Sequence, residues 1–211
     1  MNKGLNAKKR VVLIGASVGG AWRIGSLPQR IGSESYEFQY VHGGSQFDKS
    51  ERVRQVLERQ ENRADVVILK ECAAYFPGDL GLYRKLMEGW VEECRQAGVV
   101  PVPATVVPVT RLHAYKIFLG YPLLRGKNPF EYGWPFQQKR FRSLCAYNDW
   151  LRGFAAQEGL GLLDLEAALR ISAKNRYLRP RSARLDGLHL KPAAYSVLDR
   201  IVIPALENIP E

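Results

Sequence analysis

Short apolar runs alternate with longer amphipathic segments along most of the chain. The apolar runs have the length and composition of buried strands, and they lie at residues 10–14, 37–41, 65–69, 99–107 and 161–165. Between them, apolar residues recur every three or four positions, which predicts helices at 50–60, 80–97, 136–158 and 192–207. This alternation predicts an α/β protein, a three-layer α/β/α sandwich around a parallel sheet of about five strands.

One segment, at about residues 110–135, does not follow the alternation. It has no clean period, contains several glycines and prolines, and is rich in Tyr, Phe and Trp. Long connections at the carboxyl ends of strands often border the functional site of an α/β protein. The segment therefore forms either the wall of a pocket or the cover of a secondary core. We expect one domain, residues 1–211, with this aromatic-rich insertion.

The overall composition is that of a folded protein. The chain has 211 residues, of which 46% are hydrophobic and 25% charged, and this excludes a disordered chain. Its three cysteines show no CxxC or Cys/His spacing, so we expect free thiols, no metal and no cofactor. Cys72 is a conceivable nucleophile, although a buried thiol is the simpler interpretation. Free thiols favour a reducing compartment, and we expect a cytoplasmic protein.

The N-terminal pattern admits a second interpretation. The basic residues at 8–10 and the run at 11–22 resemble a secretory signal, but the run contains three glycines and its apolar core is only four residues long. A buried strand fits that core better. No stretch of the sequence reaches the roughly 18 apolar residues of a membrane-spanning helix.

The charge is strongly positive and unevenly distributed. There are 31 basic and 21 acidic residues, giving +10, and residues 170–191 alone carry +6. Such a balance is typical of proteins that bind nucleic acid, an anionic membrane surface or an anionic substrate, and it is also found on solvated faces. Because the larger basic run leads into Asp186 and His189, we favour an anionic substrate over nucleic acid.

A serine follows the first predicted strand. Ser17 lies in a turn of small residues, Gly15-Ala16-Ser17-Val18-Gly19-Gly20, that would lift its hydroxyl off the end of the sheet. A dinucleotide-binding loop is the rival interpretation. The glycine spacing is not GxGxxG, and the second strand ends at His42 without the acidic residue that would bind a ribose.

An aspartate and a histidine lie together near the other end of the chain. Asp186 precedes His189 by three residues, in a turn before the last predicted helix. The carboxylate can orient the imidazole and leave its other nitrogen facing a serine, which makes the hydroxyl a nucleophile. Each residue alone would also fit a structural turn.

Taken together, the two ends resemble the SGNH or GDSL-like hydrolases, a family of esterases, lipases and acetylhydrolases. In that family the nucleophile follows the first strand and the base belongs to a C-terminal Asp-x-x-His. The resemblance implies a flavodoxin-like fold, with Ser17 as nucleophile, His189 as base and Asp186 as its orienting carboxylate. It also implies a backbone oxyanion donor after the second strand, for which Gly44 is the match and Gly43 the alternate. His42 borders this turn and could touch the substrate, although a structural histidine that caps the strand end is the simpler interpretation.

The middle of the chain departs from the family pattern. Where the family has Gly-x-Asn-Asp after the third strand, this chain has Glu71 for the Gly and Ala73 for the Asn, so a side-chain oxyanion donor is missing. Loss of one such donor costs about 100- to 1000-fold in turnover unless it is replaced. Lys70 or a backbone N–H near Cys72 are candidate replacements, and Lys70 and Glu71 could also form a buried pair that shapes the site.

Two functions follow from these observations. The first is a serine hydrolase that cleaves an ester, an acyl or acetyl ester of a small molecule or glycan with sugar-containing or anionic character. The second is a catalytically impaired module that binds an anionic glycan or nucleic acid. The departure at Ala73 would allow this, as would Ala16, which replaces the aspartate that the family has beside the nucleophile. The oligomeric state, the acyl chain and the alcohol portion have no signature in the sequence.

Overall fold

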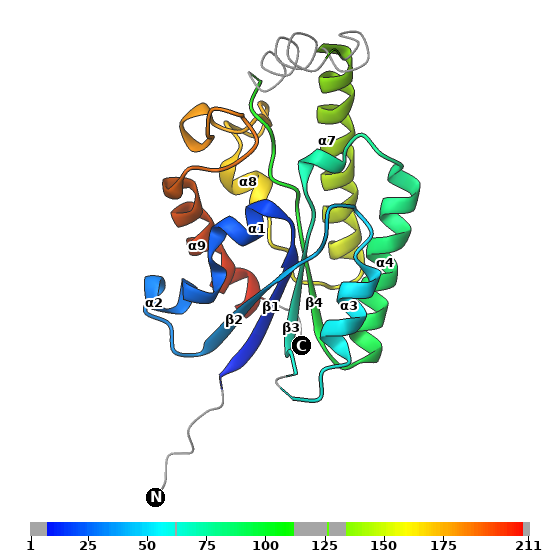
Figure 1. Cartoon of the computed structure of the whole chain (residues 1–211), viewed down its shortest axis with the longest axis vertical. Coiled ribbons are helices and arrows are strands. Elements are labelled where there is room, and N and C mark those ends of the chain that lie inside the picture. The colour runs from blue at the N-terminus through cyan, green and yellow to red at the C-terminus, as the bar shows by residue number, and fades with distance from the viewer. Residues whose placement is uncertain (1–7, 62, 112–125, 127–133, 209–211) are drawn as a thin grey trace, which may run out of the picture.

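A parallel sheet forms the centre of the molecule (Figure 1). The computed structural model describes residues 8–61, 63–111, 126 and 134–208. Within them the sheet has the strand order β2-β1-β3-β4, and every neighbouring pair is parallel. The strands are β1 (Lys9–Gly15), β2 (Tyr36–His42), β3 (Val66–Lys70) and β4 (Val100–Ala104).

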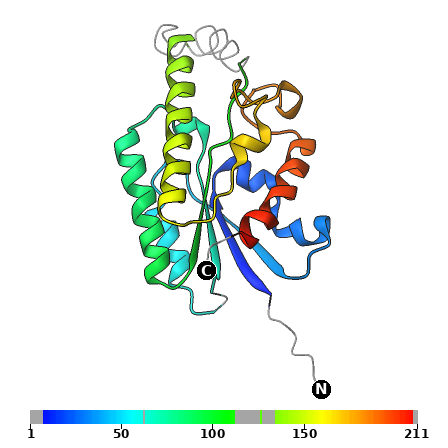
Figure 2. The same cartoon turned by 180° about the vertical axis from the view of Figure 1, so that it is seen from behind.

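Helices cover both faces of the sheet, which confirms the predicted three layers (Figures 1 and 2). One face carries α3 (Ser50–Leu57), α4 (Leu80–Gln96) and α7 (Trp134–Gln157). The other carries α1 (Ser17–Trp22), α2 (Leu27–Ile31), α8 (Leu165–Leu169) and α9 (Pro192–Glu207).

Burial on both faces explains why the strands are apolar without alternation. Val11 and Leu13 of β1 belong to the core under α1 and α9, whereas Val12 and Ile14 belong to the core under α4 and α7. All four are at most 3% exposed. A parallel strand covered on both sides has no solvent-facing positions, so it reads as a continuous apolar run.

The prediction of about five strands is corrected to four within the described residues. The segment predicted at 161–165 forms only a single parallel bridge, between Leu163 and Ala104 at the edge of β4. Asp164 then caps helix α8, accepting a hydrogen bond from the N–H of Ala167. Because the helix begins immediately after the bridge, the chain has no room for a fifth strand there.

The strand predicted at 99–107 is also shorter, ending at Ala104. Two residues later the Asn148 side chain takes the place of a neighbouring strand, because its Oδ1 accepts from the Val106 N–H and its Nδ2 donates to the Val106 carbonyl. These bonds, 2.8 and 2.9 Å long, satisfy the buried backbone after the strand has ended.

The four predicted helices agree with α3, α4, α7 and α9 to within three residues at each end. The short helices α1, α2 and α8 were not predicted, since five or six residues are too few for a helical period. Most of the aromatic-rich insertion predicted at about 110–135 lies outside the described residues. In the part of the chain that is described, no helix is both long and apolar enough to cross a membrane.

A buried carboxylate ties the basic run to the rest of the fold. Glu166 of α8 is fully buried and accepts hydrogen bonds from Asn148, Arg152 and Arg176. Burial alone would raise the pKa of Glu166, but the bonds from Arg176 and Asn148 outweigh it and hold this pKa below its ordinary value. Arg170 also faces Glu166, at 3.8 Å. Two arginines of the basic run are therefore paired internally.

We expect Glu166→Ala to lower the free energy of unfolding by about 3 kcal/mol, because it leaves arginine side chains partly buried without their anion. A matched exposed pair, Arg95–Glu158, has side chains 38% and 41% exposed. Glu158→Ala should therefore cost less than about 1 kcal/mol. Urea unfolding of the two variants measures the difference, and equal losses would contradict a stabilising role for Glu166.

Candidate active site

Ser17 is presented at the carboxyl end of the central strand. It follows β1 as the first residue of α1, and its residue surface is exposed, whereas Gly15 and Ala16 before it are buried. Tyr40 of β2 packs against this turn. Its hydroxyl lies 3.0 and 3.1 Å from the carbonyl oxygens of Gly15 and Ala16.

The glycines of this turn are explained by packing. A Cβ atom on Gly19 would lie 3.0 Å from the Tyr40 ring, and one on Gly20 would lie 3.2 Å from it. Both positions are therefore small because the tyrosine approaches the helix closely, and no dinucleotide is needed to account for them.

The turn before α9 brings a histidine to the serine. In this turn Asp186 Oδ1 accepts from the backbone N–H groups of Leu188 and His189, each at 2.9 Å. Its Oδ2 lies 2.7 Å from His189 Nδ1, and His189 Nε2 lies 3.2 Å from Ser17 Oγ. The fold thus joins residues 172 positions apart in one hydrogen-bonded chain of side chains.

The environment of Asp186 keeps it ionised. Burial acts to raise its pKa, but the hydrogen bonds from the Leu188 N–H and from the His189 side chain outweigh burial and lower it to about 2. The His189 and Asp186 side chains remain 37% and 48% exposed. An ionised carboxylate therefore faces the imidazole at neutral pH, at a position that solvent and ligands can reach.

The turn after β2 lies beside Ser17, but its donors are engaged. The Gly43 N–H donates to the carbonyl oxygen of Gly15 at 2.7 Å, so it joins the two turns and is not available to a ligand. The Gly44 N–H donates to Nδ1 of His42 at 3.0 Å. Gly44 has φ of +92°, a conformation that favours glycine.

Lys70 is the last residue of β3 and Glu71 follows it, both in the interior. Both are 1% exposed, and Lys70 Nζ donates to the carbonyl oxygen of Glu71 at 2.9 Å. The Glu71 carboxylate binds Lys49, not Lys70. Burial raises the pKa of Glu71 to about 7, while the neighbouring Lys49 acts in the opposite direction. Ala73 is buried in the turn that follows, and its methyl group can donate no hydrogen bond.

Lys49 is the residue of this region that sequence reasoning missed. It lies just before α3, 22 positions from Glu71, and it is 2% exposed. A lone lysine ahead of a helix is ordinary in a sequence. Only the three-dimensional pairing distinguishes it from a solvated lysine.

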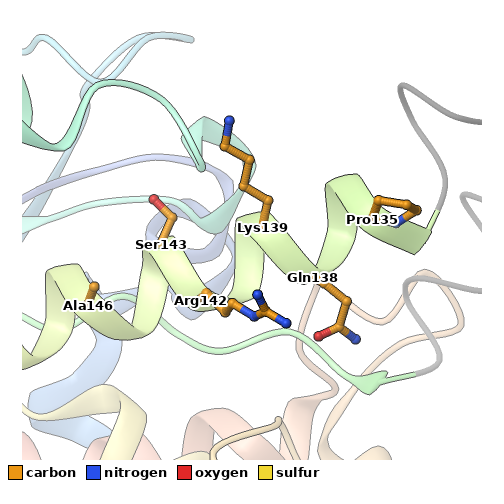
Figure 3. Close-up of a pocket in the computed structure, with 6 residues that line it drawn as sticks. All are labelled: Pro135, Gln138, Lys139, Arg142, Ser143 and Ala146. Carbon is orange, nitrogen blue, oxygen red and sulfur yellow. The ribbon is translucent and has the colours of Figure 1, made fainter.

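A pocket of about 730 Å³ lies along the first half of α7. None of the side chains that line it is one of the predicted site residues. Figure 3 shows Lys139 and Arg142 extending in different directions from the helix. Among the described residues no group of three or more His, Cys, Asp or Glu side chains is placed to hold a metal ion. The described cysteines are free, and Cys72 is buried.

The low pKa of Asp186 has a consequence for stability. Because this pKa is about 2 in the folded chain against an ordinary value of 3.8, the carboxylate contributes stability that is present above about pH 4 and is lost as pH falls through 2. We expect the difference in unfolding free energy between the wild type and Asp186→Asn to shrink as pH falls below about 4. Urea unfolding across that range tests this, and a difference that does not change with pH would contradict it.

Of the comparisons with known proteins, only the one with solved structures finds similar proteins. No protein-family model and no curated protein sequence matches the chain. Among solved structures, it is similar to a GDSL-like lipase from Bacteroides thetaiotaomicron, with a TM-score of 0.68, 14% identity, and 98% of this chain and 92% of that chain covered. It is also similar to a lipase/acylhydrolase from Enterococcus faecalis, with a TM-score of 0.65, 15% identity and coverage of 94% and 95%.

An acetyl-xylooligosaccharide esterase variant from Geobacillus is similar over 94% of each chain, with a TM-score of 0.57 and 16% identity. At these identities the likeness shows the fold. It supports the resemblance indicated by Ser17, Asp186 and His189, and the chain has the fold of the SGNH and GDSL-like hydrolases.

Proposed function

We propose that this protein is a serine hydrolase that cleaves an ester. The observation that carries the proposal is the chain of hydrogen-bonding distances from Asp186 through His189 to Ser17, 2.7 and 3.2 Å, on an exposed edge of the sheet. The solved structures with this fold include lipases, an acylhydrolase and an acetyl esterase, which supports ester hydrolysis in general.

The reaction follows from the roles these three groups can take. His189 Nε2 removes the proton of Ser17 Oγ as that oxygen attacks the ester carbonyl carbon, and Asp186 stabilises the imidazolium that forms. The imidazolium then gives the proton to the departing alkoxide, leaving an acyl group on Ser17. Water, deprotonated by His189, attacks the acyl carbon and releases the acid, and Ser17 recovers its proton.

The negative charge on the carbonyl oxygen needs donors. We assign this role to the backbone N–H groups of Ser17 and Gly44. Because the Gly44 N–H is bonded to His42 Nδ1, it must exchange that acceptor for the oxyanion during the reaction.

For the substrate we propose an acyl or acetyl ester of a small molecule or glycan. The exposed bases Lys174, Arg181, Arg184 and Lys191 belong to the segment that carries His189, and they support an anionic or sugar-containing alcohol portion. Arg170 and Arg176 face the Glu166 carboxylate, which offsets part of their charge. They therefore add less positive potential near His189 than the exposed basic residues do. Comparing acetylated neutral and acidic oligosaccharides as substrates tests the charge preference.

Ser17→Ala should lower kcat for a short-chain p-nitrophenyl ester by about 10⁴-fold or more, and His189→Ala should do so to a similar extent, because the two residues act as one unit. A serine-directed phosphonate should add its mass to Ser17 in the wild type. The control is Ser172→Ala, which changes an exposed serine of the basic run and should leave kcat unchanged. Absence of both turnover and the adduct in the wild type would refute the proposed function.

Two substitutions distinguish whether His42 competes for the Gly44 N–H or assists the reaction. His42→Ala removes the acceptor that competes for the Gly44 N–H, so kcat should rise by about 2- to 10-fold, the net worth of one hydrogen bond. His42→Asn retains a side-chain acceptor for the N–H two residues on and should leave kcat near the wild-type value. Steady-state kinetics of both variants provide the measurement, and a lower kcat for His42→Ala would show that His42 assists the reaction.

A further inference from the structure

A buried ion pair lies directly behind the turn that contains Gly44. Lys49 Nζ donates to Glu71 Oε2 and, at 3.0 Å, to the carbonyl oxygen of Phe47. The side chains of Lys49 and Glu71 are each 1% exposed. The ammonium also lies 4.9 Å from the centre of the Tyr75 ring, an arrangement that favours a cation over an aromatic face.

The stem of Lys49 packs against the turn itself. A Cβ atom on Gly43 would lie 2.6 Å from both Cδ and Cε of Lys49, so the lysine runs along the backbone of this residue. Gly43 in turn donates its N–H to Gly15. The position of the lysine therefore limits where the Gly43 backbone can lie relative to the Ser17 turn.

The turn after β3 holds Gly44 from another side. The Tyr75 hydroxyl donates to the Gly44 carbonyl oxygen at 3.2 Å, and the Tyr83 hydroxyl donates to the Tyr75 carbonyl oxygen at 2.9 Å. Glu71, which binds Lys49, and Tyr75, which binds Gly44, are four residues apart in this one turn.

We propose that Lys49, Glu71 and Tyr75 are positioning residues that hold the Gly44 N–H where it can serve as an oxyanion donor: Lys49, bound to Glu71, packs against Gly43 before it, and Tyr75 holds the Gly44 carbonyl after it. This inference rests on the proposed function. Glu71 and Tyr75 belong to the turn after β3, where the chain departs from the SGNH pattern with Glu71 and Ala73 in the places of a glycine and an asparagine. The turn after β3 lacks the side-chain donor of the family pattern. Instead it holds Gly44, the backbone donor in the turn after β2.

Two features argue against a pair that serves stability alone. Removing two charges from water is costly, and apolar residues of similar volume are often as stabilising or more so. In addition, Glu71 Oε1 has no hydrogen-bond partner within the part of the chain described, so the pair is not optimised as a network. The bond to Lys49 also neutralises Glu71, which would otherwise oppose negative charge on a bound oxyanion.

The test replaces both partners, because one partner alone would leave an uncompensated buried charge. In Lys49→Met/Glu71→Leu we expect a folded protein whose kcat for a p-nitrophenyl ester falls about 100-fold, with KM changed less than about 3-fold, since misplacement by about 1 Å has this effect. The Gly44 amide should exchange its hydrogen at least about tenfold faster by NMR, because the turn is no longer held.

The control is another ion pair, the partly buried Arg30–Asp199 between α2 and α9. Arg30→Met/Asp199→Asn should leave kcat and the exchange of the Gly44 amide within about 2-fold of the wild type, because neither residue contacts the turn. A folded Lys49→Met/Glu71→Leu variant with wild-type kcat and wild-type Gly44 exchange would overturn the positioning role.

A milder variant covers the case in which the double variant does not fold. Tyr75→Phe removes only the hydroxyl on the Gly44 carbonyl, and we expect kcat to fall about 3- to 10-fold with faster Gly44 exchange. No change in either quantity overturns the proposal. If the wild type hydrolyses no ester and forms no adduct on Ser17, the proposed function fails, while Gly44 exchange in these variants still decides whether the three residues hold the turn.

Discussion

The parallel register of β1 with β2 and β3 places three turns at the same edge of the sheet. Gly15 lies opposite His42, and the pairing of Ile14 with Leu69 puts Lys70 next to it on the other side. The turns that follow these residues therefore start side by side. The 2.7 Å bond from the Gly43 N–H to the Gly15 carbonyl joins the first two turns, so the serine turn and the neighbouring glycine turn are tied to each other.

His189 reaches this edge from the far end of the chain, and its position depends on a different set of contacts. Glu166 holds Arg176 at the start of the segment, and Leu190, fully buried against the core under α9, holds its end. Between these two anchors the Asp186 turn is closed by its own hydrogen bonds. The basic run is therefore partly a structural element, and only its exposed members add to the potential near His189.

The parts of the fold that follow from local pattern could be predicted from the sequence. The strand before Ser17 and the turn from Asp186 to His189 depend on neighbouring residues, and both lie where they were expected. The prediction of a fifth strand is wrong because Asp164 caps helix α8 at a point where the sequence still has the pattern of a strand. Lys49 and Arg176 were not identified as internal partners, because a buried lysine or arginine looks the same in a sequence as a solvated one until its carboxylate is placed beside it.

The departures from the family pattern have a common physical logic. An asparagine donates from its own side chain, whereas a backbone N–H is placed only by the backbone on either side of it. Because Gly44, the proposed donor, has no side chain and has φ of +92°, its position is restricted by contacts from other residues. The Tyr75 hydroxyl on its carbonyl and the Lys49 stem against Gly43 provide such restraints, and Glu71 keeps the lysine in place. The buried charges thus lie where a flexible backbone needs rigid support.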